Sequence, residues 1–102
     1  MTKVYISGQI TGRPTEEARK HFYGMQFKLE NDGFLTHNPL QMPDRDTWQE
    51  YMKDSLSWLV DCDIIMMLKG WQHSRGAILE RMIAWELGIE IWYEEGAWEV
   101  KT

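Results

Sequence analysis

The stretch Ile64-Ile65-Met66-Met67-Leu68 decides the fold, because every one of its residues is apolar. A strand with one face in water alternates apolar and polar residues, whereas a strand covered on both faces is apolar throughout. We therefore predict a central strand of a parallel sheet that has helices on both faces. The stretch is the longest apolar run in the chain and is far shorter than the ~20 residues of a membrane span. No membrane-embedded segment is expected.

Stretches typical of strands and of helices alternate on both sides of this run. We predict strands at residues 3–7, 34–37, 64–68 and 89–93, and helices at residues 18–29, 46–61 and 74–87. Asp46 and Gln49 have capping-box spacing and are expected to begin the second helix. This order predicts an α/β fold, a three-layer α/β/α sandwich with a four- to five-stranded parallel sheet of the flavodoxin-like or Rossmann-like kind. Residues 97–100 either add an edge strand or dock on another subunit.

Composition narrows the classes of function. The chain has 102 residues and a net charge of −5, with no cluster of Lys or Arg, so we expect one domain over residues 1–102 that binds neither a nucleic-acid polymer nor a membrane. Cys62 is the only cysteine and the histidines are scattered, which favours a cytoplasmic protein with no metal and no cofactor. Six Trp and seven Met are more than one small core absorbs. Some of them should contact a ligand or a partner subunit.

The loop after the first strand is one candidate ligand site, because ligands of open α/β sheets bind beyond the carboxyl ends of the strands. It runs from Ser7-Gly8 to Gly12-Arg13 and offers a hydroxyl, two glycines and a cation. Such a loop can bind an anion through its backbone N–H groups. Its spacing matches no phosphate-binding motif, so glycines that only permit the turn are an equally good interpretation.

The loop before the third helix is the second candidate. Ser74 is the expected N-cap, and Gly76 keeps the first turn uncrowded. The same helix N-terminus, together with the Ser74 hydroxyl and Arg75, is also suited to hold a phosphate. The loop by itself does not distinguish a cap from a binding site.

Glu80 is the most informative residue in this helix. Ala77, Ile83, Ala84 and Leu87 are expected to pack on the sheet, and the spacing of Glu80 places it on the same face. A carboxylate on a buried face costs several kcal/mol unless it has partners. Near the helix N-terminus it would lie in the pocket wall, where a carboxylate can act as a nucleophile or a general base. We therefore prefer a functional role to a structural ion pair. Tyr5 is expected in the core with its hydroxyl near this crevice.

Several segments together resemble the nucleoside 2-deoxyribosyltransferase-like superfamily. These are VYISG at 4–8, WQEYMKDSL at 48–56, DCD at 61–63 and SRGAILE at 74–80 followed by Ala84 and Leu87-Gly88. The similarity covers nearly the whole chain and is greatest to a small branch of bacterial and phage proteins. It implies the three-layer fold of that superfamily and a catalytic glutamate, the nucleophile that attacks C1′ of the sugar, four residues after the glycine. Glu80 has this spacing from Gly76.

The resemblance also implies roles for other residues. Related deoxynucleoside 5′-monophosphate N-glycosidases have a serine that binds the 5′-phosphate six residues before the glutamate, where this chain has Ser74. Trp71 is a candidate for stacking on the base. The superfamily also has an aspartate on the second helix that assists catalysis. In this chain Ser55 stands at the expected position of that aspartate, and Asp54, the nearest acid, precedes it by one residue. The superfamily also implies a homodimer or higher homo-oligomer that completes each site, with Trp58, Trp85, Trp92 and Trp98 as candidate contacts.

The expected function is cleavage or transfer of the N-glycosidic bond of a (deoxy)nucleoside or its 5′-monophosphate at Glu80. The first alternative is a non-catalytic module that binds a nucleotide derivative in the same crevice. The second is an assembly protein whose Trp and Met residues serve only subunit contacts. An Asp54 carboxylate within reach of Glu80 and a common void favours catalysis, and one directed to solvent favours binding.

Overall fold

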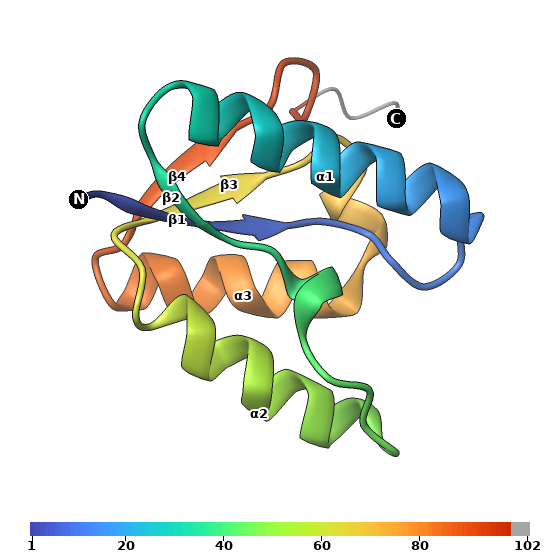
Figure 1. Cartoon of the computed structure of the whole chain (residues 1–102). Coiled ribbons are helices and arrows are strands. Elements are labelled where there is room, and N and C mark those ends of the chain that lie inside the picture. Colours follow the sequence, from blue (N-terminus) through green and yellow to red (C-terminus); the bar gives the residue numbers. More distant parts are fainter. Residues whose placement is uncertain (99–102) are drawn as a thin grey trace.

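The computed structural model describes residues 1–98 (Figure 1). Strands and helices alternate along this part of the chain. In order they are β1 (Lys3–Ser7), α1 (Thr15–Asn31), β2 (Leu35–His37), the 3-10 helix η1 (Pro39–Gln41), α2 (Trp48–Leu59), β3 (Ile64–Met67), the 3-10 helix η2 (Trp71–His73), α3 (Arg75–Glu86) and β4 (Glu90–Tyr93). The predicted order of strands and helices is confirmed, and η1 and η2 are additions that the sequence patterns did not indicate.

The four strands form one parallel sheet in the order β2-β1-β3-β4. Figure 1 shows α1 on one face of this sheet and α2 with α3 on the other, which confirms the predicted α/β/α sandwich. From β1 the chain connects to β2 on one side of the sheet, and from β3 it connects to β4 on the other side. The gap between β1 and β3 is therefore the topological switch point, where such folds bind their ligands. Ser7 pairs with Met67, so β1 and β3 end at the same level and their following loops lie together.

Strand β3 contributes to both halves of the core, as its continuous apolar sequence predicts. Ile64 and Met66 pack with α1, whereas Ile65 and Met67 pack toward the face that holds α2 and α3. All four residues are buried. Because successive side chains point to opposite faces of a strand, only a strand covered on both faces is apolar at every position.

Two details of the helices differ from the prediction. The N-cap of α2 is Thr47, whose hydroxyl accepts a hydrogen bond from the Glu50 N–H, so the capping box lies one residue later than Asp46 and Gln49. Leu87 does not pack on the sheet but is 57% exposed. Helix α3 ends at Glu86, and Leu87 is its C-cap. The prediction assumed that the helix continues through Leu87, which would have directed this side chain toward the sheet.

The C-terminal segment folds back on η2 as far as it is described. Ala97 is buried and Trp98 packs against Trp71, so these two residues add no strand to the sheet. Glu99 and Val100, the rest of the predicted tail, lie outside the described residues. None of the described helices combines the length and apolar character needed to cross a membrane.

Candidate functional site

A pocket of about 640 Å³ opens beside the carboxyl ends of the strands. Its lining comes from three segments: the loop after β1, the segment from η1 into the first turns of α2, and the loop from His73 into α3. Glu80 is the residue farthest along α3 that lines the pocket. The pocket therefore lies at the topological switch point between β1 and β3, where ligands of this kind of fold bind.

Glu80 is a buried carboxylate with both oxygens engaged. The hydroxyl of Tyr5 donates to Oε2 over 2.6 Å, and the hydroxyl of Ser7 donates to Oε1 over 2.7 Å. Only 5% of Glu80 is exposed, although the residue lines the pocket. Tyr5 and Ser7 are themselves fully buried and alternate along β1, which points both side chains to the face of the sheet that α3 covers. The sequence predicted that a glutamate on the buried face of this helix needs partners. These partners are two hydroxyl groups and not a cation.

Burial and hydrogen bonding act on Glu80 in opposite directions. Burial raises the pKa of the Glu80 carboxyl above its usual range, while the hydroxyls of Tyr5, Ser7 and Ser55 lower it. Burial and the nearby negative charge of Glu80 together raise the pKa of Tyr5 well above 10. Tyr5 therefore stays protonated and remains a donor. Two donated hydrogen bonds fix the orientation of the carboxylate and favour its charged form.

The N-terminus of α3 forms the polar end of the pocket. The Ser74 hydroxyl accepts a hydrogen bond of 3.1 Å from the Ala77 N–H, which confirms Ser74 as the N-cap. Arg75 lies with its guanidinium carbon 3.8 Å from the centre of the Trp48 ring. Ser74, Arg75 and Gly76 all line the pocket, so a cation, a hydroxyl and a helix N-terminus meet there. This combination suits an anionic group.

Gly8 and Gly76 line the pocket at positions where a side chain would be crowded by its neighbours. A Cβ on Gly8 would lie 3.0 Å from Cβ of Leu68, and a Cβ on Gly76 would lie 3.1 Å from Sδ of Met52. The backbone therefore approaches its neighbours more closely than a larger residue permits. Of the four residues predicted as an anion site after the first strand, Gly8 is the one that lines the pocket.

The other members of that predicted site lie elsewhere. The Ser7 hydroxyl is directed to Glu80, and Gly12 is an exposed turn residue with φ of +87° that does not line the pocket. The Arg13 guanidinium is held by the Gln9 carbonyl, His21 and Glu17, away from the pocket. These contacts hold Arg13 outside the pocket, and its predicted role in binding a ligand stays a prediction.

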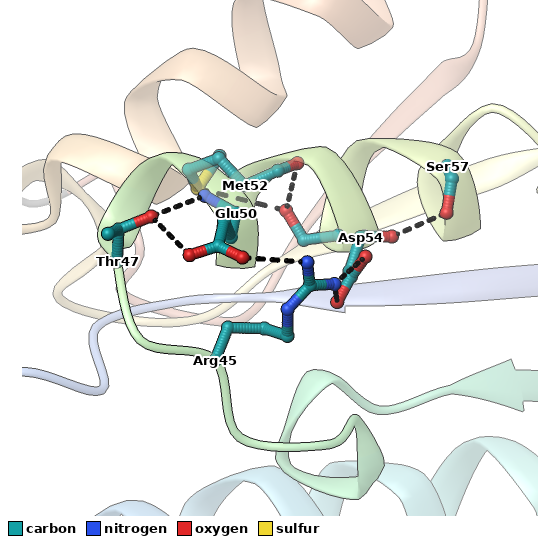
Figure 2. A network of polar contacts seen from close by, with 7 residues as sticks. Arg45, Thr47, Glu50, Met52, Asp54 and Ser57 are labelled. Atoms are coloured by element: carbon teal, nitrogen blue, oxygen red, sulfur yellow. Dashed lines mark hydrogen bonds and ion pairs between the residues drawn. The ribbon is translucent and has the colours of Figure 1, made fainter.

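Figure 2 shows Asp54 directed to Arg45, whereas the hydrogen-bond partners of Glu80 are Tyr5 and Ser7. Nη1 of Arg45 lies 2.9 and 2.7 Å from the two Asp54 carboxylate oxygens, while its Nη2 donates to Glu50 over 3.0 Å. Asp54 does not line the pocket, whereas Arg45 does. Its neighbour Ser55 is fully buried and lowers the pKa of Glu80. The Ser55 hydroxyl donates to the Met52 carbonyl over 3.2 Å. One step along a helix turns a side chain by about 100°, so Ser55 is buried while Asp54 reaches Arg45.

Trp71 is also outside the pocket. Its ring is buried against Tyr93 and Trp98, and its Nε1 donates to the Ala97 carbonyl over 3.1 Å. Trp71 therefore anchors the C-terminal segment, and the prediction that it stacks on a bound base is not matched by its position. Trp48, at the beginning of α2, is the tryptophan that lines the pocket.

Several pocket residues carried no signal in the sequence. Trp48 and Tyr51 belong to the first turns of α2, and Pro39, Leu40 and Met42 form an apolar wall. The wall comes from η1, which the sequence patterns did not indicate, and neither Trp48 nor Tyr51 was predicted as a site residue. A Trp so close to the start of an amphipathic helix was the one available sign. Among residues 1–98, no three His, Cys, Asp or Glu side chains are grouped as metal ligands.

Comparison with protein families gives a match over residues 2–93, to the family described as Domain of unknown function (DUF4406). The chain belongs to the DUF4406 family. The matched segment contains all four strands, all three helices and every residue that lines the pocket. No curated protein matches the chain. The DUF4406 description carries no activity, so a function for this member has to be argued from the site.

Proposed function

We propose that the chain cleaves or transfers the N-glycosidic bond of a (deoxy)nucleoside or its 5′-monophosphate, with Glu80 as the nucleophile. The observation that carries this proposal is the buried Glu80 carboxylate at the pocket, oriented by the hydroxyls of Tyr5 and Ser7. A structural ion pair would place a cation beside Glu80, and none of the salt bridges of residues 1–98 includes it. The resemblance of this segment to nucleoside 2-deoxyribosyltransferases supports the same role.

The reaction proceeds by two displacements at C1′ of the sugar. A Glu80 oxygen attacks C1′ as the bond from C1′ to the base nitrogen breaks, and the base leaves with the bonding electron pair and takes up a proton. Water or a second base then attacks C1′, loses a proton and releases the carboxylate. Tyr5 and Ser7 hold the carboxylate in the orientation for attack, which lowers the barrier by avoiding reorganisation.

The polar and the apolar parts of the pocket lining suit the phosphate and the base of a nucleotide. Ser74, Arg75 and the N-terminus of α3 are placed to bind a 5′-phosphate, and this favours a monophosphate over a nucleoside. The apolar wall around Leu40 and Met42 offers a surface for a flat base, beside the Trp48 ring on which Arg75 stacks. The pocket volume of about 640 Å³ is within the usual range for small-molecule sites.

A second function, non-catalytic binding of a nucleotide derivative, is favoured by the position of Asp54. N-glycosidic cleavage needs a proton for the departing base, and the superfamily draws on an acid from this helix. Here Asp54 is bound to Arg45 and Ser55 is fully buried. Under the catalytic proposal, the proton comes from another pocket group or from water.

The experiment that separates these functions measures free base and ligand binding in parallel. The chain and its Glu80→Gln variant are incubated with a panel of nucleosides and their 5′-monophosphates. We expect base release by the wild type, a loss of about 10³-fold or more in Glu80→Gln, and monophosphate binding by both. Glu16→Gln, an exposed glutamate on α1, is the matched control and should keep full activity.

Each other outcome has a definite meaning. If neither protein releases base but both bind a monophosphate, the chain is a binding module. Equal base release by wild type and Glu80→Gln contradicts the role of Glu80 as nucleophile. If no member of the panel binds, both proposed functions are wrong.

A further inference from the structure

Tyr51 carries a hydroxyl that has no hydrogen-bond partner within residues 1–98. The residue belongs to the first turns of α2 and lines the pocket together with Glu80. Every buried side-chain nitrogen or oxygen atom of the described chain has a hydrogen-bond partner, so a hydroxyl without one is not enclosed by protein. The Tyr51 hydroxyl is therefore open to the pocket and available to a bound molecule.

Glu80 keeps this hydroxyl protonated. Burial and the negative charge of Glu80 both raise the pKa of Tyr51. The carboxylate is therefore near Tyr51, although its hydrogen bonds come from Tyr5 and Ser7. A phenol that ionises so reluctantly is a poor general acid for a departing base, because efficient proton transfer needs a pKa near the working pH. As a neutral group it can donate one hydrogen bond and accept others, which suits a hydroxyl group of a ligand.

The proposed reaction brings one sugar hydroxyl next to Glu80. In a nucleoside the base lies on the β face of the sugar ring, so a carboxylate that displaces it attacks C1′ from the α face. The 2′-hydroxyl of ribose lies on this α face and is bonded to the carbon next to C1′. A ribonucleotide poised for attack therefore directs its 2′-hydroxyl to the surroundings of the carboxylate, where a deoxyribonucleotide has only hydrogen.

Tyr51 is the hydroxyl around Glu80 that can bind this group. Tyr5 and Ser7 already donate to the carboxylate over 2.6 and 2.7 Å. Ser55 is fully buried, and its hydroxyl donates to a backbone carbonyl of α2 over 3.2 Å. In the described chain, a 2′-hydroxyl beside the carboxylate thus meets one uncommitted hydroxyl, and this hydroxyl comes from α2.

We propose that Tyr51 binds the 2′-hydroxyl of the substrate and makes the chain prefer ribonucleotides to deoxyribonucleotides. The inference rests on the proposed function and names its sugar. Hydrogen bonds to the 2-hydroxyl of a sugar strengthen in the transition state of glycoside cleavage. A site that binds a substrate hydroxyl also discriminates strongly against the analogue that lacks it, since the protein group is then left without a partner. Tyr51 is therefore a specificity-determining residue.

Matched pairs of substrates test this assignment. Release of free base is measured from the 5′-monophosphates of adenosine, guanosine, cytidine and uridine and from their 2′-deoxy counterparts. We expect kcat/KM of the wild type to be about 30-fold or more higher for the ribose member of the accepted pair. Tyr51→Phe removes only the hydroxyl, so this ratio should fall to about threefold or less. Tyr23→Phe, on α1, is the matched control and should keep the wild-type ratio.

Calorimetric binding to Glu80→Gln separates this proposal from the proposed reaction. In this variant the ribose member of the pair should bind about tenfold more tightly than the deoxyribose member. The double variant that combines Glu80→Gln with Tyr51→Phe should lose this advantage. A chain that releases no base but shows this difference in binding contradicts the reaction and supports the assignment of Tyr51.

The remaining outcomes overturn the assignment. A preference for deoxyribose, or a ratio that Tyr51→Phe leaves unchanged, shows that Tyr51 does not bind the 2′-hydroxyl. Equal losses for both sugars in Tyr51→Phe place its hydroxyl on a group that both share, such as the 3′-hydroxyl. If no nucleotide of the panel binds, the assignment of Tyr51 and the proposed function are both wrong.

Discussion

The Tyr5 hydroxyl donates a hydrogen bond of 2.6 Å to Oε2 of Glu80 and so joins β1 to α3 across 75 positions of the chain. Both residues are buried, and Ser7 reaches the other carboxylate oxygen from the same strand. The carboxylate therefore has a fixed orientation before any ligand binds. A preorganised, partly desolvated carboxylate beside a pocket is a costly arrangement for stability and a useful one for catalysis.

Removing the Tyr5 hydroxyl should impair Glu80 in a pH-dependent way. Tyr5→Phe deletes a donor that lowers the pKa of the Glu80 carboxyl, so this pKa rises further. We expect the acid limb of the pH–rate profile to move to higher pH and the free energy of unfolding to fall by about 1–3 kcal/mol. Tyr23→Phe, on α1, is the control and should leave the profile unchanged. An unshifted acid limb in Tyr5→Phe would show that the hydroxyl does not tune Glu80.

Neutralising Glu80 should stabilise the fold at neutral pH. Burial raises the pKa of this carboxyl above its ordinary 4.5, so as pH rises from about that value the unfolded chain ionises before the folded one. Ionisation then favours unfolding, and the free energy of unfolding falls until the pH exceeds the folded-state pKa. Glu80→Gln lacks this loss. Thermal melts should show a higher Tm for Glu80→Gln at pH 7, by about 4–8 °C for each kcal/mol.

The same melts at lower pH provide the check on this sign. Below about pH 4.5 both forms of residue 80 are neutral in the folded and unfolded chain, so the advantage of Glu80→Gln should shrink there. Glu16→Gln, which changes an exposed side chain, should show no such pH dependence. A Glu80→Gln variant less stable than wild type at every pH would mean that the donated hydrogen bonds outweigh the penalty of burial.

Ligand selectivity should depend on the N-terminus of α3. Ser74→Ala removes a hydroxyl from the proposed phosphate end, and we expect about tenfold weaker binding of a 5′-monophosphate with less than about twofold change for the nucleoside. It should also lower stability by about 1 kcal/mol through loss of the N-cap. Calorimetric titration of both ligands measures the difference. Equal effects on the two ligands would exclude phosphate binding by Ser74.

The two arginines predicted near the phosphate should behave differently. Arg75 lines the pocket, whereas Arg13 is held by Gln9, Glu17 and His21 outside it. Arg75→Ala should weaken monophosphate binding at least as much as Ser74→Ala does, and Arg13→Ala should leave it unchanged. If Arg13→Ala weakens binding as strongly as Arg75→Ala, the loop after β1 takes part in recognition after all.

Asp54 should prove to be a structural residue. It pairs with Arg45, and the two side chains are 30% and 37% exposed, so the pair stabilises the chain by less than about 1 kcal/mol. Asp54→Asn is expected to change kcat/KM for base release by no more than about threefold. Loss of activity by about 100-fold in a variant with an unchanged circular dichroism spectrum would instead place Asp54 in the reaction.

Prediction from sequence was accurate for features that depend on which residues are buried, because the spacing of apolar residues indicates burial. The uninterrupted apolar run of β3 identified a central parallel strand, and the inward spacing of Glu80 identified a carboxylate that needed partners. The contacts of Arg13, Asp54 and Trp71, which hold all three side chains outside the pocket, could not be predicted, because no local pattern specifies the distant partners of a side chain. The N-cap of α2 was wrong by one residue because Asp46 and Thr47 both precede suitable side chains three positions later.

The spacing of apolar residues and the positions of Gly and Pro determined the alternation of strands and helices and the parallel sheet. They also determined that Glu80 lies on the buried face of α3. These features follow from local spacing and from the need to bury apolar surface. Tertiary structure alone decided which side chains surround that carboxylate. Tyr5 and Ser7 donate to Glu80, and Asp54 turns away to Arg45, since contacts between distant segments depend on strand register and helix rotation. On α2, a difference of one position leaves the Ser55 hydroxyl buried and the Asp54 carboxylate at the Arg45 side chain.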